Sequence, residues 1–298
     1  EGYVVDYYCN EANRKKIEAT GANFKDYGID FEQIDPTKRF QMINGALKFV
    51  KFAKATVDKF LFDWKKQNYD LVIYDSCAYA GVVLGHLLDV KIMNSTTTMF
   101  HTVDTMKKTS SRVAVYEFFN SIFTQPLEWL KFCFYSFWML KKYSIRPTTL
   151  SVLTSLCDLN VTYTARELQP HHEVLDSKKF KFLGSIIKDR PKDPEFPYER
   201  LENTRVVYVS LGTVYTTNKQ FLVNCIEGLR EIKDILVVMS LGPNIDIKEL
   251  GDIPENFIIR KFIPQLDVLK KADVFVSHAG NNSLNESLSF GVPMVLCP

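Results

Sequence analysis

Short runs of Val and Ile alternate with longer amphipathic segments along most of the chain. Such runs, bounded by polar or Gly residues, are typical of buried parallel strands. We expect strands at residues 3–9, 71–75, 91–94, 206–210, 235–240, 274–277 and 294–297. Helical spacing of the apolar residues predicts helices over 11–20, 40–66 and 219–232. This alternation predicts an α/β fold built on parallel sheets.

A charged stretch with three prolines, residues 188–203, interrupts the alternation. Proline removes a backbone donor and fixes φ, so neither a helix nor a strand is expected to persist there. We therefore predict an N-terminal domain over 1–190, a linker over 191–203 and a C-terminal domain over 204–298. A chain of 298 residues, 46% of them hydrophobic, is long enough to form two cores.

Aromatic residues are concentrated between positions 118 and 140. Their near-helical spacing predicts two aromatic helices, broken around residues 124–126. The apolar run 132–140 is much shorter than the roughly 20 residues that a bilayer span requires, so no membrane segment is predicted here. Core packing is the first interpretation of these rings, and the wall of a pocket for an apolar ligand is the second.

Charge and cysteine usage exclude several classes of protein. The formal net charge is only +2, and no cluster of Lys and Arg argues for nucleic-acid binding. The six cysteines are scattered, with neither a C-x-x-C pair nor zinc spacing, which favours a reducing compartment and argues against a metal. No signal-peptide pattern opens the chain, so a cytoplasmic location is expected. Both ends look cut, and a leader or membrane anchor could lie outside them.

The most informative segment follows the strand expected at 274–277 and reads His278-Ala-Gly-Asn-Asn-Ser-Leu-Asn-Glu286. A strand that ends in His-x-Gly and opens into a helix directs backbone N–H groups and a positive helix end at one point, where a phosphate fits. Gly280 allows close approach of the backbone, while Asn282 and Ser283 add donors. Glu286, one turn further on, offers a carboxylate to sugar hydroxyls. The pattern predicts a nucleotide-diphosphate site.

This His-x-Gly-x-Asn-Ser-x-x-Glu pattern resembles the donor signature of the UDP-glycosyltransferases. Phe262-Ile-Pro-Gln265 resembles the Trp-x-Pro-Gln of that family, and Ser210-Leu-Gly-Thr213 resembles its Ser-x-Gly-Ser/Thr. With residues 253–256 and 291–294, the likeness is greatest to the macrolide-glycosyltransferase branch over most of 201–298, and looser over 1–200. Each motif alone could be an ordinary strand exit, helix start or core histidine, but all three in order favour the family.

The resemblance implies two Rossmann-like domains facing a cleft, the GT-B type, incomplete at both ends. It implies inverting transfer of a hexosyl group, most simply glucose, from a UDP-sugar to a hydroxyl of a small hydrophobic acceptor. No Asp-x-Asp occurs to hold a divalent metal, so metal-independent transfer without a cofactor is expected. The implied donor-binding residues are Thr213, Phe262, Ile263, Gln265, His278, Gly280, Asn282, Ser283 and Glu286. The implied acceptor pocket includes Phe119, Phe123 and Trp138.

The sequence departs from the family pattern at the catalytic base. In the family a histidine after the first strand takes the acceptor proton, and an aspartate at the end of a later strand orients it. Asp75, at the end of the strand expected at 71–75, matches the aspartate, although it could instead cap a helix. The five histidines are His86, His101, His171, His172 and His278, and none follows a first strand. We expect the base upstream of Tyr3.

Two alternatives stay open at this point. The chain could bind a nucleotide sugar without catalysis, or it could be another GT-B enzyme such as a sugar-nucleotide epimerase. An Asp/Glu-Gln pair that contacts the donor sugar in the family is expected beyond Pro298, so this sequence does not name the sugar. The acceptor and the oligomeric state are not predicted either.

Overall fold

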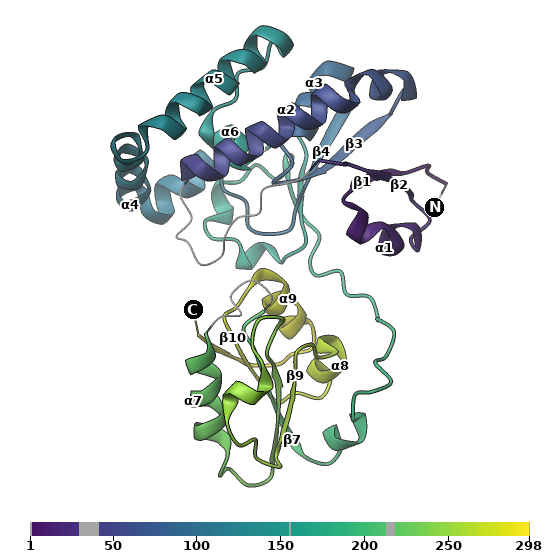
Figure 1. Cartoon of the computed structure of the whole chain (residues 1–298), viewed down its shortest axis with the longest axis vertical. Helices are drawn as coiled ribbons and strands as arrows, with labels where there is room; N and C mark the ends of the chain where they lie inside the picture. Colours follow the sequence, from purple (N-terminus) through teal and green to yellow (C-terminus); the bar gives the residue numbers. More distant parts are fainter. Residues whose placement is uncertain (1, 30–41, 155, 213–217, 298) are drawn as a thin grey trace. The chain divides into compact units, whose positions relative to one another are not determined.

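The computed structural model describes residues 2–29, 42–154, 156–212 and 218–297, with the side chains of 110–118 left out. The chain forms two compact units (Figure 1). Unit 1 comprises residues 1–162 and 170–181, and unit 2 comprises residues 163–169 and 182–298. Both units are built on parallel strands, as the alternating pattern predicts.

In unit 1, four strands pair in the order β3-β4-β5-β6, while β1 and β2 form a separate parallel pair. The strands are β1 Asp6–Cys9, β2 Asn23–Asp26, β3 Leu71–Asp75, β4 Lys91–Thr96, β5 Asn160–Thr162 and β6 Phe180–Phe182. The α-helices are α1 Arg14–Glu18, α2 Met42–Gln67, α3 Ala80–Leu88, α4 Val103–Thr124, α5 Pro126–Tyr143 and α6 Thr149–Thr154, with short 3-10 helices η1 Glu11–Asn13 and η3 His172–Val174.

The long helix α2 organises the core of unit 1. Its apolar residues recur at helical spacing, so one side of it buries Ile43, Val50 and Val57 completely. This side packs against α3, α5 and α6. The core cluster includes Val83 of α3 and Met139 of α5, both with no exposed surface. Its residues are thus drawn from helices far apart in the sequence.

The break predicted among the aromatic residues is confirmed. Helix α4 begins with a reciprocal cap between Thr102 and Thr105 and ends at Thr124, with Gln125 as its C-cap residue. Pro126 then occupies the first turn of α5, where its missing N–H costs no helical hydrogen bond. The two aromatic helices are therefore separate elements.

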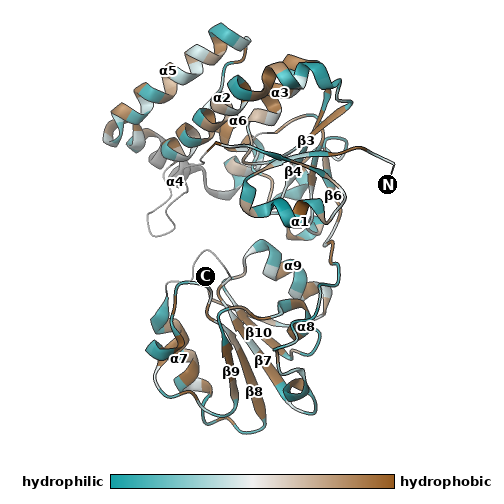
Figure 2. Cartoon of the chain, turned by 45° about the vertical axis from the view of Figure 1, so that its right-hand side comes forward, coloured by the Kyte–Doolittle hydropathy of each residue, from teal (hydrophilic) through white to brown (hydrophobic). Residues whose placement is uncertain are grey.

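In unit 2, five parallel strands pair in the order β11-β10-β7-β8-β9. Figure 2 shows these strands as the hydrophobic centre of the unit, with more polar helices around them. The strands are β7 Arg205–Ser210, β8 Ile235–Ser240, β9 Phe257–Arg260, β10 Val274–Ser277 and β11 Met294–Leu296. The helices are η2 Arg166–Leu168, η4 Tyr198–Leu201, α7 Lys219–Leu229, η5 Ile247–Leu250, α8 Gln265–Leu269 and α9 Asn281–Ser289.

The stretch 188–203 belongs to unit 2. Phe196 and Leu201 are 3% and 4% exposed and pack in a cluster with Val206 and Ile258. The prolines prevent a long helix, but four residues form the 3-10 helix η4. The domain limits predicted at 190 and 204 stay a prediction, because compactness alone does not define a domain boundary.

The order of strands in unit 2 reverses direction at β7. From β7 the chain proceeds through β8 to β9 on one side and then returns to β10 and β11 on the other. The loops that follow β7 and β10 therefore leave in opposite directions from neighbouring carboxyl ends. In open parallel sheets this reversal is the place where ligands bind.

Candidate nucleotide-sugar site

The carboxyl ends of β7 and β10 bring two of the predicted motifs together. Ser210 and Ser277, the last residues of these strands, are register partners. The turn containing Gly212 follows the first, and His278 follows the second. Ser210 and Ser277, which are 67 positions apart in the sequence, thus meet at the strand-order reversal. Thr213, the remaining predicted residue of the first turn, lies outside the described residues.

The imidazole of His278 is held between two glycine backbones. A Cβ on Gly212 would lie 2.5 Å from His278 Cε1, and a Cβ on Gly280 would lie 2.6 Å from His278 Nε2. Gly212 also has a φ of 76°, a conformation that side chains rarely adopt. Both glycines are therefore required by the close approach of this ring.

Burial lowers the pKa of His278 below its ordinary value, because a charged imidazolium loses solvation there. At neutral pH the ring is consequently neutral. A neutral imidazole offers one N–H donor rather than a full positive charge. His278 can thus donate a hydrogen bond to a ligand oxygen, while positive potential has to come from elsewhere.

The start of α9 supplies that potential. Gly280 is the N-cap residue and, having no side chain, makes no side-chain cap. The first helical hydrogen bond joins Leu284 N–H to the Gly280 carbonyl at 2.9 Å, so the N–H groups of residues 281–283 precede the helical ladder. The helix dipole places partial positive charge at the same point. Asn282 is exposed there, whereas Ser283 is 6% exposed.

One turn further along α9, Glu286 lies at the centre of a hydrogen-bonded chain. Gln265 Nε2 donates to Glu286 Oε2 at 2.5 Å, and Arg190 Nη2 donates to Oε1 at 3.1 Å. The hydroxyl of Tyr208 in turn donates to Gln265 Oε1 at 2.9 Å. The Glu286 side chain is only 13% exposed. A carboxylate held in this way keeps its direction while its remaining lone pairs can accept from a ligand.

Tyr208 was not among the residues predicted for the site. It is 1% exposed and stacks on Phe275 with ring centroids 4.7 Å apart. Burial raises the pKa of Tyr208, so its hydroxyl stays protonated and remains a donor to Gln265. In the sequence it is one residue of an apolar strand, and no local signal distinguishes it from core.

Arg190 was also missed, for a different reason. It stands in the charged, proline-containing stretch 188–203, at the last position of the predicted N-terminal domain and next to the predicted linker. Only the tertiary structure brings it to Glu286, 96 positions later. Its side chain is 66% exposed, so it can leave the carboxylate at little cost when a ligand binds.

The loop between β9 and α8 carries the remaining donor motif. Phe262 is 65% exposed, which leaves its ring open to a flat ligand. Ile263 instead packs against the core cluster of unit 2, so a ligand contact of Ile263 would involve its backbone. Pro264 precedes α8 and directs Gln265 toward Glu286.

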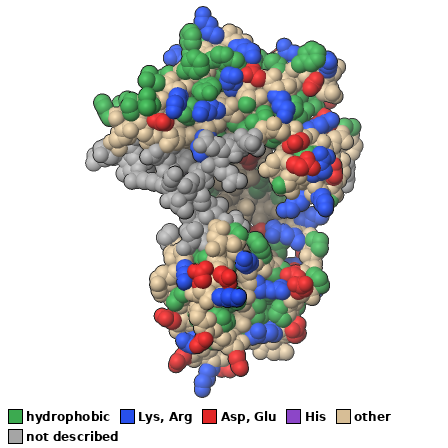
Figure 3. All heavy atoms as spheres, in the orientation of Figure 1, with side chains coloured by type: hydrophobic (Ala, Val, Ile, Leu, Met, Phe, Trp, Pro, Cys, Tyr) green, Lys and Arg blue, Asp and Glu red, His purple; other side chains and the backbone are tan. Residues whose placement is uncertain are grey.

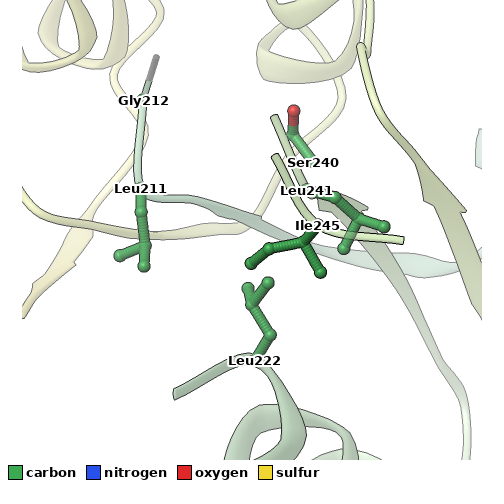
Figure 4. A pocket seen from close by; sticks show the side chains of 6 residues that line it. All are labelled: Leu211, Gly212, Leu222, Ser240, Leu241 and Ile245. Atoms are coloured by element: carbon green, nitrogen blue, oxygen red, sulfur yellow. The ribbon is translucent and has the colours of Figure 1, made fainter. Parts of the chain in front are cut away.

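A shallow hollow lies beside this edge of the sheet (Figure 4). It is lined by Leu211, Gly212, Leu222, Ser240, Leu241 and Ile245. The only side-chain oxygen among these lining residues belongs to Ser240, and this hydroxyl already donates to the Lys261 carbonyl at 3.3 Å. A diphosphate requires several donors, so the start of α9 suits it better than this apolar hollow.

Asp75 of unit 1 ends β3 and closes a tight turn. Its Oδ1 accepts a hydrogen bond from Cys77 N–H at 2.9 Å, and its carbonyl accepts from Ala78 N–H at 2.7 Å. The N-cap of α3 is Tyr79, so the alternative that Asp75 caps this helix is wrong. The residue is exposed. Its carboxylate therefore has a fixed direction and further lone pairs to offer.

The three predicted acceptor residues lie in different surroundings. Phe119 and Phe123 of α4 are 55% and 82% exposed. Trp138 of α5 is partly buried against the core of unit 1, with Lys54 Nζ 4.1 Å and Lys142 Nζ 4.7 Å from its ring centroid. Trp138 therefore has a packing role, whereas the two Phe rings are open to a ligand.

Two further features concern the described residues as a whole. Among them, no group of three or more His, Cys, Asp or Glu side chains is placed to hold a metal ion. Within the same residues, no helix combines the length and apolarity needed to cross a membrane.

The family follows from a comparison with known proteins. The model of the UDP-glucoronosyl and UDP-glucosyl transferase family matches residues 31–298. The chain belongs to this family. It is therefore a glycosyltransferase, an enzyme that uses a nucleotide sugar and an acceptor, as the three motifs predict.

Named relatives place the chain more closely. It is 30% identical to an uncharacterized UDP-glucosyltransferase, YojK of Bacillus subtilis, over 100% of the chain and 73% of that protein. The NDP-glycosyltransferase YjiC of Bacillus licheniformis is 29% identical over 100% of the chain and 73% of its own length. Oleandomycin glycosyltransferase of Streptomyces antibioticus is 32% identical over 45% of the chain and 31% of its own length. The predicted likeness to the macrolide branch is confirmed.

Solved structures confirm the predicted fold. The glycosyltransferase of kitacinnamycin superposes with a TM-score of 0.80 at 24% identity, over 100% of this chain and 73% of that one. The calicheamicin glycosyltransferase CalG4 gives 0.76 at 21% identity over the same shares. The fold is accordingly GT-B, with two Rossmann-like domains.

Proposed function

We propose that this glycosyltransferase moves a hexosyl group, most simply glucose, from a UDP-sugar to a hydroxyl of a small hydrophobic acceptor, with inversion and without a metal. One observation carries the proposal. At the β10–α9 transition, His278 is held between two glycines beside an uncapped helix start, and the Glu286 network lies one turn away.

In this proposal the helix start of α9 binds the diphosphate. Negative charge develops on the leaving UDP during transfer, and groups fixed beforehand stabilise such charge best. The N–H groups of residues 281–283 precede the helical ladder, and Ser283 and the neutral His278 ring add donors. Asn282 contributes an exposed amide. Helix dipole and hydrogen bonds then supply what a divalent cation supplies elsewhere.

The nucleoside is proposed to lie along Gln265, Phe262 and Glu286. Glu286 accepts from ribose hydroxyls, and the bonds from Gln265 and Arg190 fix the direction of its carboxylate. The exposed Phe262 ring stacks on uracil. Gln265 is itself held by a hydrogen bond from the buried Tyr208, so the position of Glu286 relative to the Phe262 loop is fixed.

Asp75 is proposed to act as a positioning residue for the base. An imidazole takes the acceptor proton only if its other nitrogen is held in the right tautomer, and a carboxylate does this. The turn at Cys77 fixes the direction of the Asp75 carboxylate. The histidine that it would orient is expected upstream of Tyr3, so activity has to be measured on the full-length protein.

The acceptor is proposed from the printed names of relatives and from exposed aromatic side chains. The titles of related proteins name oleandomycin, calicheamicin and a spinosyn aglycone, all small molecules. Phe119 and Phe123 are the exposed rings that we assign to such a ligand, whereas Trp138 is assigned to packing.

Calorimetry with UDP on the chain and on Glu286→Ala tests the donor site. A hydrogen bond to a charged group contributes about 1.5–3 kcal/mol, so the variant should bind UDP roughly 10- to 100-fold more weakly. Arg190→Ala is the matched control, since it removes the exposed partner and keeps the carboxylate, and it should cost less than about fivefold. Equal UDP affinity in the chain and in Glu286→Ala would contradict this site.

Transfer itself is tested on the full-length protein with UDP-glucose and a panel of phenols and macrolides, with products identified by mass spectrometry. A glucosylated acceptor supports the proposal. UDP binding with no product on any acceptor would favour a binding protein without catalysis. Conversion of UDP-glucose to another UDP-sugar would favour an epimerase.

A further inference from the structure

Helix α5 is apolar on both of its sides. Its inner side packs against α2 and α4 and buries Phe132, Met139 and Tyr143. Its outer side exposes Leu127, Leu130, Phe134 and Phe137 by 64%, 66%, 64% and 59%. These four residues are called the α5 ridge below. A surface helix of a globular protein normally carries polar side chains on its outer side, so the ridge requires an explanation.

The ridge is continuous and projects outward. Positions 127, 130, 134 and 137 follow helical spacing, which aligns them along one face. Beyond the break at Gln125, Ile122 of α4 is also 37% exposed. Figure 1 shows α5 at the margin of unit 1, and Figure 3 shows hydrophobic side chains along it with Lys and Arg among them. Such a projecting helix face suits a deformable surface better than a preformed groove.

Charge is concentrated in the same helices. Helix α2 contains six lysines and two aspartates, α4 contains three basic and two acidic residues, and α5 contains three lysines and one glutamate. These three helices together contain twelve basic and five acidic residues. The whole chain, by comparison, has 37 basic and 35 acidic residues and a net charge of only +2. The rest of the chain is therefore net negative.

The lysines border the ridge itself. The side chain of Lys131 is 56% exposed, whereas Lys142 pairs with Asp58 of α2 at 2.6 Å and is not part of this border. Lys141 Nζ lies 5.7 Å from the ring centroid of Phe137. A long aliphatic stem lets such a lysine lie beside an apolar face while its ammonium reaches an anionic group above it.

We propose that the α5 ridge binds the surface of an anionic lipid bilayer. Leu and Phe enter the boundary between headgroups and acyl chains, and Lys131 and Lys141 of α5 pair with anionic headgroups. A second copy of the chain is disfavoured as the occupant, because it would oppose two positively charged helix layers. The inference does not depend on the identity of the sugar or the acceptor.

Co-sedimentation of the full chain with vesicles tests this proposal. Binding is expected to vesicles of mixed phosphatidylcholine and phosphatidylglycerol, at least roughly tenfold above binding to phosphatidylcholine alone. High salt should weaken that binding, since it screens the lysines. The combined variant Leu130→Gln, Phe134→Gln, Phe137→Gln should lose roughly tenfold or more of it. All three side chains are more than half exposed, so the fold should persist, which a thermal melt verifies.

Two further variants separate the contributions. Leu183→Gln with Ile186→Gln replaces apolar residues that are 56% and 68% exposed elsewhere, and it should leave vesicle binding unchanged. Lys131→Gln with Lys141→Gln keeps the ridge and should reduce both the affinity for anionic vesicles and its dependence on salt.

Several results would overturn the proposal. The first is failure of the chain to bind anionic vesicles, and the second is equally strong binding to neutral vesicles. Undiminished binding by the folded ridge variant would also contradict the proposal. Light scattering provides another. If the chain is a dimer that the ridge variant converts to a monomer, and no vesicle binding occurs, the ridge is covered by a second copy instead.

Discussion

The ends of β10 and β3 are both places where a strand passes into a polar turn, yet neighbouring side chains hold them differently. At the end of β10, His278 is wedged between two glycines, and Glu286 belongs to a chain of bonds through Gln265 to the buried Tyr208. At the end of β3, the carboxylate of Asp75 is exposed and bonds to the backbone of its own turn. The first arrangement is organised before any ligand binds, whereas the second becomes a site only together with another group.

The largest effect should come from Asp75. If it orients the base, Asp75→Asn in the full-length protein should lower kcat by roughly 10²- to 10⁴-fold, the usual contribution of general base catalysis. UDP affinity should change little, because the proposed diphosphate site lies in unit 2. Steady-state kinetics together with UDP calorimetry separate these effects. Unchanged turnover would show that Asp75 only stabilises the turn at Cys77 and does not position the base.

Substitutions of the aromatic side chains of unit 1 should distinguish residues that pack in the core from residues that line the acceptor pocket. Trp138→Ala removes a ring that packs on the core and should cost roughly 2–4 kcal/mol of unfolding free energy. Phe123→Ala changes an 82% exposed ring and should leave stability unchanged while raising the acceptor KM. Thermal melts and acceptor kinetics on both variants test this. If Phe119→Ala and Phe123→Ala both leave KM and acceptor preference unchanged, the pocket lies elsewhere.

The histidine clamp of unit 2 predicts a steric effect of moderate size. Gly280 has φ −55° and ψ 145°, which alanine tolerates, so Gly280→Ala tests contact with His278 alone. The displaced ring should cost roughly 1–3 kcal/mol of stability and weaken UDP binding. Gly228→Ala is the matched control, because its Cβ would meet nothing within 4 Å and helix α7 should gain up to about 1 kcal/mol.

A double variant decides whether the ring is the cause. Adding His278→Ala to Gly280→Ala removes the clash, so most of the lost stability should return. Equal melting temperatures for the single and double variants would show that Gly280 matters for another reason.

The smallest effect concerns Phe262. Aromatic stacking contributes about 0.5–1.5 kcal/mol beyond area burial, so Phe262→Ala should weaken UDP binding by roughly 2- to 10-fold. Phe262→Trp restores the residue usual in the family and should strengthen UDP binding, by a smaller factor than Phe262→Ala weakens it. The ring is 65% exposed, so neither change should alter stability. Calorimetry that finds identical affinity in all three proteins would remove uracil stacking from the site.

Local patterns predicted the elements and the donor motifs because these depend on neighbouring residues. Apolar runs predicted seven of the strands in the described residues but missed β2, β5, β6 and β9, and Pro126 predicted the break between α4 and α5. The order His278, Gly280, Glu286 predicted a phosphate-binding helix start because a strand, a glycine and a helix N-terminus adjoin in sequence. Helix η4 and its flanking residues, by contrast, were expected to be linker, since short proline-rich stretches give no sign of the apolar surface that will cover them.

Sequence alone thus determined the α/β class, the family and the segment proposed to bind the diphosphate, because each is encoded in a few consecutive residues. The tertiary structure decided what lies around that segment. Arg190 and Tyr208 reach Glu286 and Gln265 from distant positions, and Gly212 is required because His278 packs against it. It also decided that one face of α5 stays exposed, since a helix with apolar residues on two sides does not reveal in its sequence which side its neighbours will cover.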